Sequence, residues 1–366
     1  MTVELKINGF YFGGWQSVRI ERGIEQIAGT FELSVTDRWN TAQGQQVMDL
    51  KPGQACEVLV DGVTVITGYT DTVTRSYDKA AHSISVSGRD KTGDLVDCSS
   101  IYKSGQWQNK KLEQIAADLC APFGIKVLVA TDTGAALPAF SIQEGESVFE
   151  SLERAARMRA LLLVSDGLGN LLLTRAGTAK APTDLTEGGN LLSAEAGFDW
   201  KDRFSVYIAK GQAQGSDDSY AETVAQPGGS VTDVAITRYR PFIVVAEDQG
   251  GNATLTQRAE WERNVRAGRG TRATLTVQGW QANGVLWQPN TLARLVSPLL
   301  SADVELLIVS AGYSLDESGS ITTLQCARPS AFDTLEEVKQ TRLDKKIRKK
   351  QGDEAGITQD DWELAP

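Results

Sequence analysis

The feature that most limits how this chain can fold is a repeat within its own sequence. The segment LKPGQACEVLV, which begins at Leu50, can be laid over LWQPNTLARLVS, which begins at Leu286. The superposed residues include a turn and the strand after it: Pro52 on Pro289, Gly53 on Asn290, and Val58 on Leu295. Internal similarity of this kind predicts two copies of one antiparallel β-domain.

Flanking segments extend the repeat. We align VITGYTDTV with IVSAGYSL, so that Gly68 and Tyr69 meet Gly312 and Tyr313, and each copy then closes with a strand near Arg89 or Arg328. Upstream, FELSV at Phe31 is matched with FSVYI at Phe204. The alternative is a chance similarity among strand-turn-strand segments.

The first hundred residues read as β-structure. Apolar side chains alternate in TFELSV, which is the period of a half-buried strand. Residues 55–60 and 63–69 predict a hairpin that turns at Asp61 and Gly62.

Beyond Trp107 the period changes to that of a helix. Leu112 to Leu119 place apolar residues on one helical face, Asn109 can cap this helix, and Pro122 follows its end. Ser147 and Glu150 form an S-x-x-E capping box for a second helix. The segment LLLVSDGLGNLLLTR then predicts a hairpin.

We therefore expect an α+β fold, mainly antiparallel β, with two related β-barrel domains and inserted α+β domains. The second barrel is interrupted by Gly- and Ser-rich loops and by the helix LTQRAEWERNVRAG. The expected parts are a first β-barrel (ring) domain at 1–98, an α+β domain at 99–190, a second β-barrel (ring) domain at 191–210 and 271–329, an inserted α+β domain at 211–270, and a charged C-terminal tail at 330–366.

Composition excludes several classes of protein. The 47 acidic and 37 basic residues give a formal net charge of -10, which opposes a broad electrostatic grip on nucleic acid or anionic lipid. The N-terminus lacks an export leader, and we expect no membrane insertion. The cysteines are far apart, so we expect reduced thiols that act as small core residues: Cys56, Cys98, Cys120 and Cys326.

The stretch SVSGRDKTGDLVDCSS, residues 85–100, gathers acids, bases and a cysteine around two glycines. A reaction centre is one interpretation. We favour a structural one, in which a strand ends at Gly88, Asp90 caps a short helix, and Leu95 and Val96 point inward. Asp94 and Asp97 would then help to close the first barrel.

No motif for chemistry emerges. His82 is the only histidine, which excludes zinc sites of two or three imidazoles, and we interpret it as a surface or edge-strand residue. GRGTRATL at Gly268 precedes a strand and lacks the phosphate-loop pattern. Asp217 and Asp218 lack calcium-loop spacing. We assign no catalytic, cofactor-binding or metal-binding residue and no cofactor.

Paired carboxylates are one enzymatic option that spacing cannot remove, because glycoside hydrolases need two acids without a fixed separation in sequence. Tryptophans could line a sugar groove in a glycan-binding or carbohydrate-active cell-wall protein, which is the alternative function: Trp15, Trp39, Trp107, Trp280 and Trp287. Packing or subunit contact is the more common role of such residues.

The succession of VSGRDKTGDLVDCS, NKKLEQIAADLCAPFGIKV, IQEGESVFESLERAARMRALLLVSDGLGNLLLTRAG and WQPNTLARLVSPLLSADVELLIVSAGYSLDESGSITTLQCARP resembles the baseplate hub family of contractile-tailed bacteriophages, in particular its Mu type. The resemblance runs from Met1 to about Pro329. Type VI secretion spike proteins are similar in their N-terminal region, but no needle-forming β-repeat follows here.

The resemblance implies a structural protein of the virion tail baseplate that assembles in the host cytoplasm. It implies a homotrimer whose six β-barrels form a ring between a six-fold tail tube protein and a trimeric spike protein, beside other baseplate proteins, with DNA passing through during ejection. From the net charge we expect a neutral or acidic channel wall with only weak or no DNA binding. No lysozyme-like segment is apparent.

The residues after Pro329 change in character. A helix-compatible start at Leu335 leads into a basic run at 345–350 and then into acids around Trp362. A solvated terminus is one interpretation. The other is a segment that orders on docking to a neighbouring baseplate or spike subunit, without a role in trimerisation.

Overall fold

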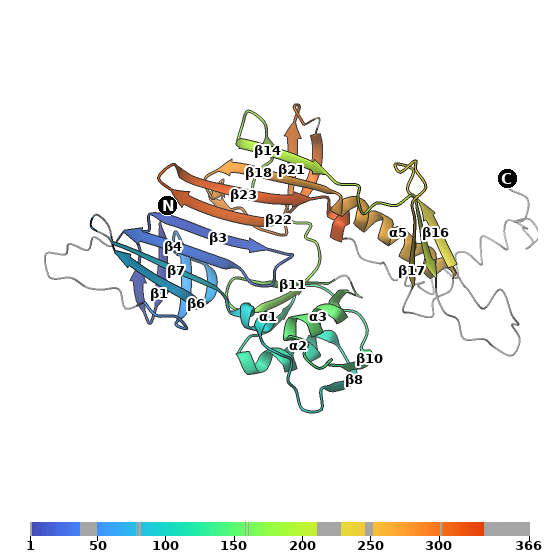
Figure 1. The fold of residues 1–366 in the computed structure, drawn as a ribbon, viewed down its shortest axis with the longest axis horizontal. Helices are drawn as coiled ribbons and strands as arrows, with labels where there is room; N and C mark the ends of the chain where they lie inside the picture. The colour runs from blue at the N-terminus through green and yellow to red at the C-terminus, as the bar shows by residue number, and fades with distance from the viewer. Residues whose placement is uncertain are drawn as a thin grey trace, which may run out of the picture. The chain divides into compact units, whose positions relative to one another are not determined.

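Antiparallel β-structure dominates the computed structural model of the chain, which describes residues 2–36, 50–77, 79, 82–157, 159, 161–210, 228–245, 252–300 and 302–332. The largest sheet has 13 strands, drawn from both the N-terminal and the C-terminal parts of the chain (Figure 1). This confirms the α+β, mainly antiparallel fold class. The tail at 335–366 and the pair Asp217 and Asp218 lie outside the described residues.

The N-terminal strands form the first half of the large sheet. In spatial order they are β2 (Phe10–Phe12), β1 (Val3–Ile7), β5 (Ala55–Val60), β6 (Val63–Tyr77), β7 (His82–Asp90), β4 (Thr30–Thr36) and β3 (Ser17–Gly23). The predicted hairpin between β5 and β6 is confirmed. Asp61 and Gly62 both have positive φ, at 47° and 81°, as a tight two-residue hairpin turn requires.

The C-terminal strands form the second half. In spatial order they are β14 (Leu191–Phe198), β18 (Thr271–Gln278), β23 (Gly319–Ala327), β22 (Ala302–Asp316) and β21 (Leu292–Ser297), with β13 (Leu185–Thr186) parallel to β21. A small hairpin of β19 (Gln281–Ala282) and β20 (Val285–Leu286) leads into it.

The two halves share one strand order. The path β3-β4-β7-β6-β5 in the first half has the same antiparallel connections as β14-β18-β23-β22-β21 in the second. Corresponding strands also agree in length: β6 and β22 have 15 residues each, and β7 and β23 have 9 each. Two related β-domains are therefore present. Among the described strand pairs, none closes either half into a barrel.

The correspondence reaches individual residues at the turn that identified the repeat. Gly53 and Asn290 both have positive φ, at 81° and 64°. The amide of Gly53 donates to Thr70 O at 2.6 Å, and that of Asn290 donates to Ile308 O at 2.8 Å. A bulge follows in each long strand, after Thr70 and after Ile308. The superposition of Pro52 on Pro289 is thus correct.

Two other parts of the predicted alignment are wrong. FSVYI is not the counterpart of FELSV, because β15 (Val206–Lys210) pairs in a separate sheet and the strand equivalent to β4 is β18. Counted from the shared bulge, Gly68 corresponds to Leu306 instead of Gly312. The Gly-Tyr dipeptide occurs at different points along the two long strands.

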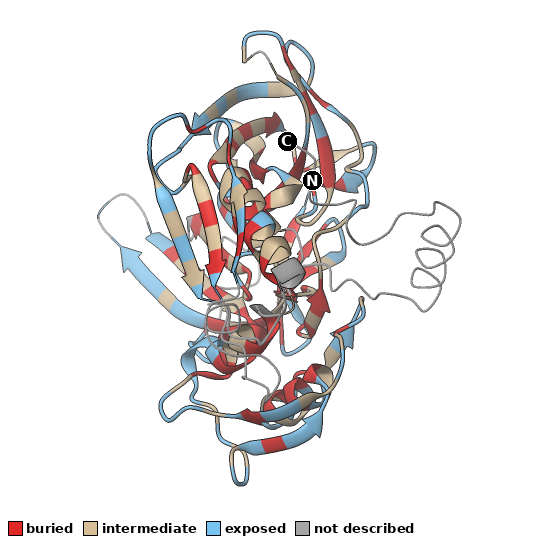
Figure 2. Cartoon of the chain, turned by 90° about the vertical axis from the view of Figure 1, so that its right-hand side faces the viewer, coloured by how far each residue is buried: buried red, intermediate tan, exposed pale blue. Residues whose placement is uncertain are grey.

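One hydrophobic core serves both halves. It joins apolar residues such as Leu5 and Leu33 from the first half to Leu275 and Leu324 from the second. Figure 2 shows buried positions alternating with half-buried and exposed ones along the strands, as expected for a sheet with one face inside. The core therefore favours a fixed relation between the two halves.

The α+β unit has a core of its own, with Ile115 and Leu152 fully buried. Its elements are β8 (Gln106–Lys110), α2 (Leu112–Cys120), η2 (Ala121–Phe123), β9 (Val127–Val129), β10 (Leu137–Ser141), α3 (Val148–Arg157), β11 (Leu162–Ser165) and β12 (Leu171–Thr174). The capping box is confirmed by reciprocal hydrogen bonds between Ser147 and Glu150, at 2.8 and 3.2 Å. The cap assigned to Asn109 is wrong, because this residue lies in β8 and Lys111 precedes α2.

A further small unit combines β15, β16 (Gly228–Thr232), β17 (Pro241–Val245) and the predicted helix, α5 (Asn252–Arg269). Tyr207 and Leu255 are buried between sheet and helix. A bidentate ion pair joins Arg203 to Asp233 at 2.8 Å, with both side chains largely buried. The chain then ends its described part in η3 (Pro329–Phe332). The five predicted domain boundaries stay a prediction.

Candidate assembly site

The two halves of the large sheet meet along a single pair of strands. β3 lies antiparallel to the last residues of β22, so that Val18 faces Leu315, Ile20 faces Tyr313, and Arg22 faces Ala311. Ile20 and Tyr313 are almost fully buried, at 0% and 1% exposure. Backbone hydrogen bonds and apolar side chains together make this junction part of the core.

Aromatic residues fix the C-terminal side of the junction. The Tyr313 hydroxyl donates a short hydrogen bond to the carbonyl of Trp287, and burial raises the pKa of Tyr313 to about 12. The indole of Trp280 donates to Ser314 O at 2.9 Å. Both tryptophans are buried, and the Trp280 indole and the Trp287 carbonyl bind β22. The Trp287 indole nitrogen has no hydrogen-bond partner among the described residues.

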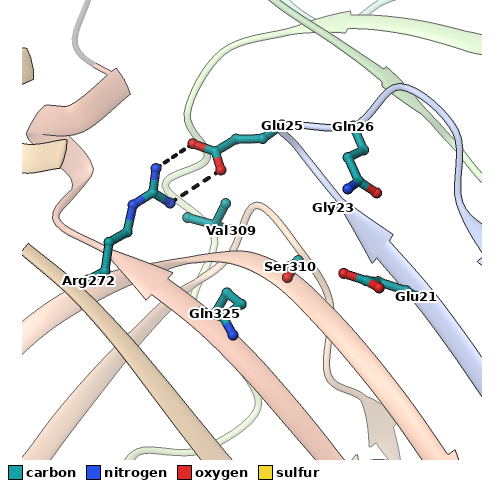
Figure 3. A pocket seen from close by; sticks show the side chains of 8 residues that line it. All are labelled: Glu21, Gly23, Glu25, Gln26, Arg272, Val309, Ser310 and Gln325. Atoms are coloured by element: carbon teal, nitrogen blue, oxygen red, sulfur yellow. Dashed lines mark hydrogen bonds and ion pairs between the residues drawn. The ribbon is translucent and has the colours of Figure 1, made fainter. Parts of the chain in front are cut away.

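A hollow of about 320 Å³ lies on the surface of this junction (Figure 3). Arg272 spans it and donates to both carboxylate oxygens of Glu25, at 2.6 and 3.3 Å. Gly23 also lines the hollow. It lies close to the neighbouring strand, since a Cβ at this position would be 3.1 Å from the Ser310 Cβ and 3.2 Å from Val309 O. Because Arg272 and Glu25 are paired with each other, the hollow is a gap between neighbouring strands whose lining residues provide no activated nucleophile or base.

The equivalent edge in each half has a neighbour on one side only among the described strands. Among the described strands, β14 pairs with β18 on one side only. The end of β6 pairs with β7 on one side only, whereas the equivalent end of β22 has partners on both sides. Tyr77 at the end of β6 and Phe198 at the end of β14 are 83% and 67% exposed.

The acidic stretch at residues 85–100 is structural. Asp90 is buried at the end of β7, where its Oδ2 accepts a 2.5 Å hydrogen bond from Ser165 of the α+β unit. Burial raises the pKa of Asp90 to about 6, although the Ser165 hydrogen bond and Arg22 oppose this. Asp90 occupies the N-cap position of η1 (Lys91–Gly93), as predicted, but its side chain does not make the expected capping hydrogen bond.

Arg89 holds the neighbouring carboxylates. Its guanidinium donates to Asp71 at 2.8 Å and to Asp97 at 2.7 Å, and its hydrogen bond lowers the pKa of Asp97. The predicted short helix exists as α1 (Asp94–Asp97), where Leu95 is buried as expected but Val96 is 42% exposed. These contacts join the first half of the sheet to the start of the α+β unit.

The remaining candidate residues do not converge. His82 is exposed at the start of β7, 5.9 Å from Tyr77 ring to ring. Cys98 is exposed, which corrects the expectation that all four cysteines are core residues; the other three are buried. The tryptophans proposed for a sugar groove are buried where described: Trp15, Trp107, Trp280 and Trp287. Trp39 lies outside the described residues.

Neither a metal site nor a membrane-spanning helix is found in the described part of the chain. The described part of the chain contains no group of three or more His, Cys, Asp or Glu side chains placed to hold a metal ion. Of the helices described, none has the length and apolar character needed to cross a bilayer.

Solved structures of a prophage tail protein and of another tail protein share this fold. The 43 kDa tail protein of prophage MuSo2 from Shewanella oneidensis matches with a TM-score of 0.80 and 40% identity, over 91% of this chain and all of that one. A tail protein from Neisseria meningitidis MC58 matches with a TM-score of 0.76 and 24% identity, over 90% and 98%. The fold is thus that of a phage tail protein.

Sequence comparisons identify the family. Baseplate hub protein gp44 of Escherichia phage Mu is 37% identical over 331 residues, covering 88% of this chain and 86% of that protein. Three family models match in order: Mu phage baseplate assembly protein GpP-like, N-terminal, at 2–90, baseplate hub protein gp44-like, second domain, at 92–175, and Mu phage baseplate assembly protein GpP, fourth domain, at 251–335.

The chain belongs to the Mu-type baseplate hub family, as the sequence resemblance indicated. Its relatives are structural baseplate proteins, and the chain is a structural protein of a Mu-like phage tail rather than an enzyme.

Sequence reasoning missed the open edges at Thr72–Tyr77 and Leu191–Phe198. Their residues are mostly polar or small, and nothing in TRSY or SAEAG indicates which neighbour a strand will have. A correct residue-by-residue alignment of the two copies would have shown that β22 pairs with β3 within the chain, while the equivalent strands β6 and β14 do not pair with each other.

Proposed function

We propose that three copies of this baseplate hub form a ring that adapts a six-fold tail tube to a three-fold spike. Each chain carries two related halves of one large sheet, so three chains would present six nearly equivalent units on one face while the ring itself keeps three-fold symmetry. The observation that supports this most strongly is the shared strand order of the two halves. A single-copy β-domain would give no reason for a change of symmetry.

Assembly partners follow from the same proposal. The face built from both sheets would contact the tail tube protein, and the three-fold face would contact the spike protein and other baseplate proteins, after assembly in the host cytoplasm. The ring would let DNA pass during ejection. The net charge of -10 supports a wall that does not retain phosphates.

The test is the mass of the purified full chain in solution, by light scattering after size exclusion. We expect three times the mass of one chain, together with incorporation into tails when the protein complements a hub-deficient phage. A chain that stays monomeric at every concentration and still complements would contradict the ring. For the channel, nanomolar retention of duplex DNA at physiological salt would contradict the passive wall.

A further inference from the structure

The second half of the large sheet carries a unit that the first half lacks. In the first half, residues 24–29 alone join β3 to β4. In the second half, the equivalent strands β14 and β18 are joined through β15, β16, β17 and α5, which we call the inserted unit. Each chain therefore has two related halves of the sheet but one inserted unit, so a surface on this unit would occur three times in the proposed ring.

The loop between β16 and β17, residues 233–240, is anchored at both ends. At its start, Arg203 donates to both carboxylate oxygens of Asp233, at 2.8 and 3.0 Å. At its end, the amide of Ser205 donates to Arg240 O and the amide of Arg240 donates to Ser205 Oγ, both at 2.8 Å. These bonds tie the loop to the chain that leads into β15, so the loop is held in one conformation.

The same loop presents apolar side chains to solvent. Val234 and Tyr239 are each 89% exposed, although Ile236 between them is buried. The exposed face continues along β17, where Ile243 and Val245 are 54% and 68% exposed while the alternate residues pack toward α5. An apolar patch beside an anchored loop is typical of an interaction surface, because little loop entropy is lost when a partner binds.

The loop charges that lack an ion-pair partner are positive. Asp233 is neutralised by Arg203, which leaves Arg238 and Arg240, and neither of these has a carboxylate partner among the described residues. Arg238 is exposed, and the guanidinium of Arg240 lies over the ring of Phe204, 5.0 Å from its centre. Cations beside an apolar patch favour a partner that places carboxylates around an apolar pocket.

We propose that residues 233–240 and the exposed face of β17 bind a protein of three-fold symmetry that offers an apolar pocket bordered by carboxylates. Under the proposed function, on which this inference rests, that partner is the spike protein. A six-fold tube would need six equivalent sites, and the inserted units of three chains supply three. Tyr239 enters the pocket, Ile243 and Val245 extend the apolar contact, and Arg238 meets the carboxylates.

The experiment is calorimetric titration of the purified full-chain hub with the purified spike protein of the same phage. Tyr239→Ser should weaken binding by about tenfold or more, because it removes a large aromatic anchor. Phe10→Ser is the matched control: Phe10 is 70% exposed in β2 of the first half, and its loss should leave the dissociation constant unchanged. Both variants should keep the mass and the melting temperature of the wild type, since both side chains are exposed.

A charge variant tests the carboxylate border of the pocket. Arg238→Glu should weaken binding, and the loss should be larger at low salt than at high salt, because salt screens charges at the rim of an interface. Lys110→Glu makes the same change of charge at an exposed position of β8 and should leave binding unchanged. This pair of variants separates a local contact from the effect of net charge.

The outcomes distinguish the docking surface from the ring. A trimer that binds the spike equally well with and without Tyr239→Ser and Arg238→Glu overturns the docking surface and leaves the ring intact. If Tyr239→Ser instead dissociates the trimer, or abolishes binding of the tube protein while spike binding is unchanged, the loop contacts a different partner and the proposal is overturned. A chain that is monomeric, or that does not bind the spike before any substitution, overturns the proposed function itself.

Discussion

Asp90→Asn should remove a pH dependence that the buried carboxyl imposes on folding. Burial raises the pKa of Asp90 from 3.8 to about 6. The folded state therefore holds the proton more tightly than the unfolded state, so the wild-type protein loses stability as pH rises through this range and the loss is complete above about pH 6. Asp90 Oδ1 has no hydrogen-bond partner among the described residues, which is consistent with a costly ionised form.

The size of the effect follows from the shift. About two pKa units correspond to about 3 kcal/mol in full, and about 2 kcal/mol of this falls between pH 4.5 and pH 7.5. We expect the free energy of unfolding of the wild type to fall by that much more than the free energy of unfolding of Asp90→Asn over the same interval. Because each protein is compared with itself at the two pH values, any pH-independent loss of stability caused by the new amide beside Ser165 cancels.

The assay is urea unfolding followed by tryptophan fluorescence, at one protein concentration, because oligomer stability depends on concentration. Asp97→Asn is the control. The hydrogen bond from Arg89 lowers the pKa of Asp97, so this pair contributes at neutral pH and its contribution is lost as pH falls, by about 0.2–1 kcal/mol for an exposed pair. If Asp90→Asn shows the same pH dependence as the wild type, the account of Asp90 is refuted.

Three further substitutions test the fold. Gly88→Ala should prevent normal folding, because a Cβ there would lie 2.1 Å from Tyr69 O and 2.7 Å from the Phe31 ring. The control is Gly13→Ala, where the nearest contact of the new Cβ is 3.6 Å. This control should have a melting temperature close to that of the wild type, measured by circular dichroism. Tyr313→Phe should lower the free energy of unfolding by about 1–2 kcal/mol, because it leaves the buried carbonyl of Trp287 without its hydrogen bond; an unchanged urea midpoint would show that this bond contributes nothing. Arg203→Met should destabilise the β15–β17 and α5 unit by about 3–5 kcal/mol, since it leaves the largely buried Asp233 carboxylate without its ion-pair partner. The measurement is hydrogen exchange, which should become faster in that unit alone. Exchange at the wild-type rate would contradict this prediction.

The sequence by itself determined the local elements and the existence of the repeat. Asp61 and Gly62 predict their hairpin because few other residues accept positive φ, and Ser147 and Glu150 predict a helix start because their side chains reach the first free amides. Pro52 and Pro289 mark equivalent turns for the same local reason. These features depend on residues a few positions apart, which a sequence displays directly.

Only the tertiary structure decided which strands lie side by side. Backbone hydrogen bonds between strands are nearly independent of side-chain identity, so FSVYI resembled the partner of FELSV although β18 fills that place. The bulges after Thr70 and Ile308 set the register of the two long strands, and the alignment of Gly68 with Gly312 missed it. Likewise, burial at the contact of β7 with the α+β unit raises the pKa of Asp90, although its hydrogen bond with Ser165 opposes this. The pairing of β3 with β22 shows which edges of β6 and β14 lack an equivalent neighbour among the described strands. Both depend on contacts between residues far apart in sequence, where local patterns carry no information.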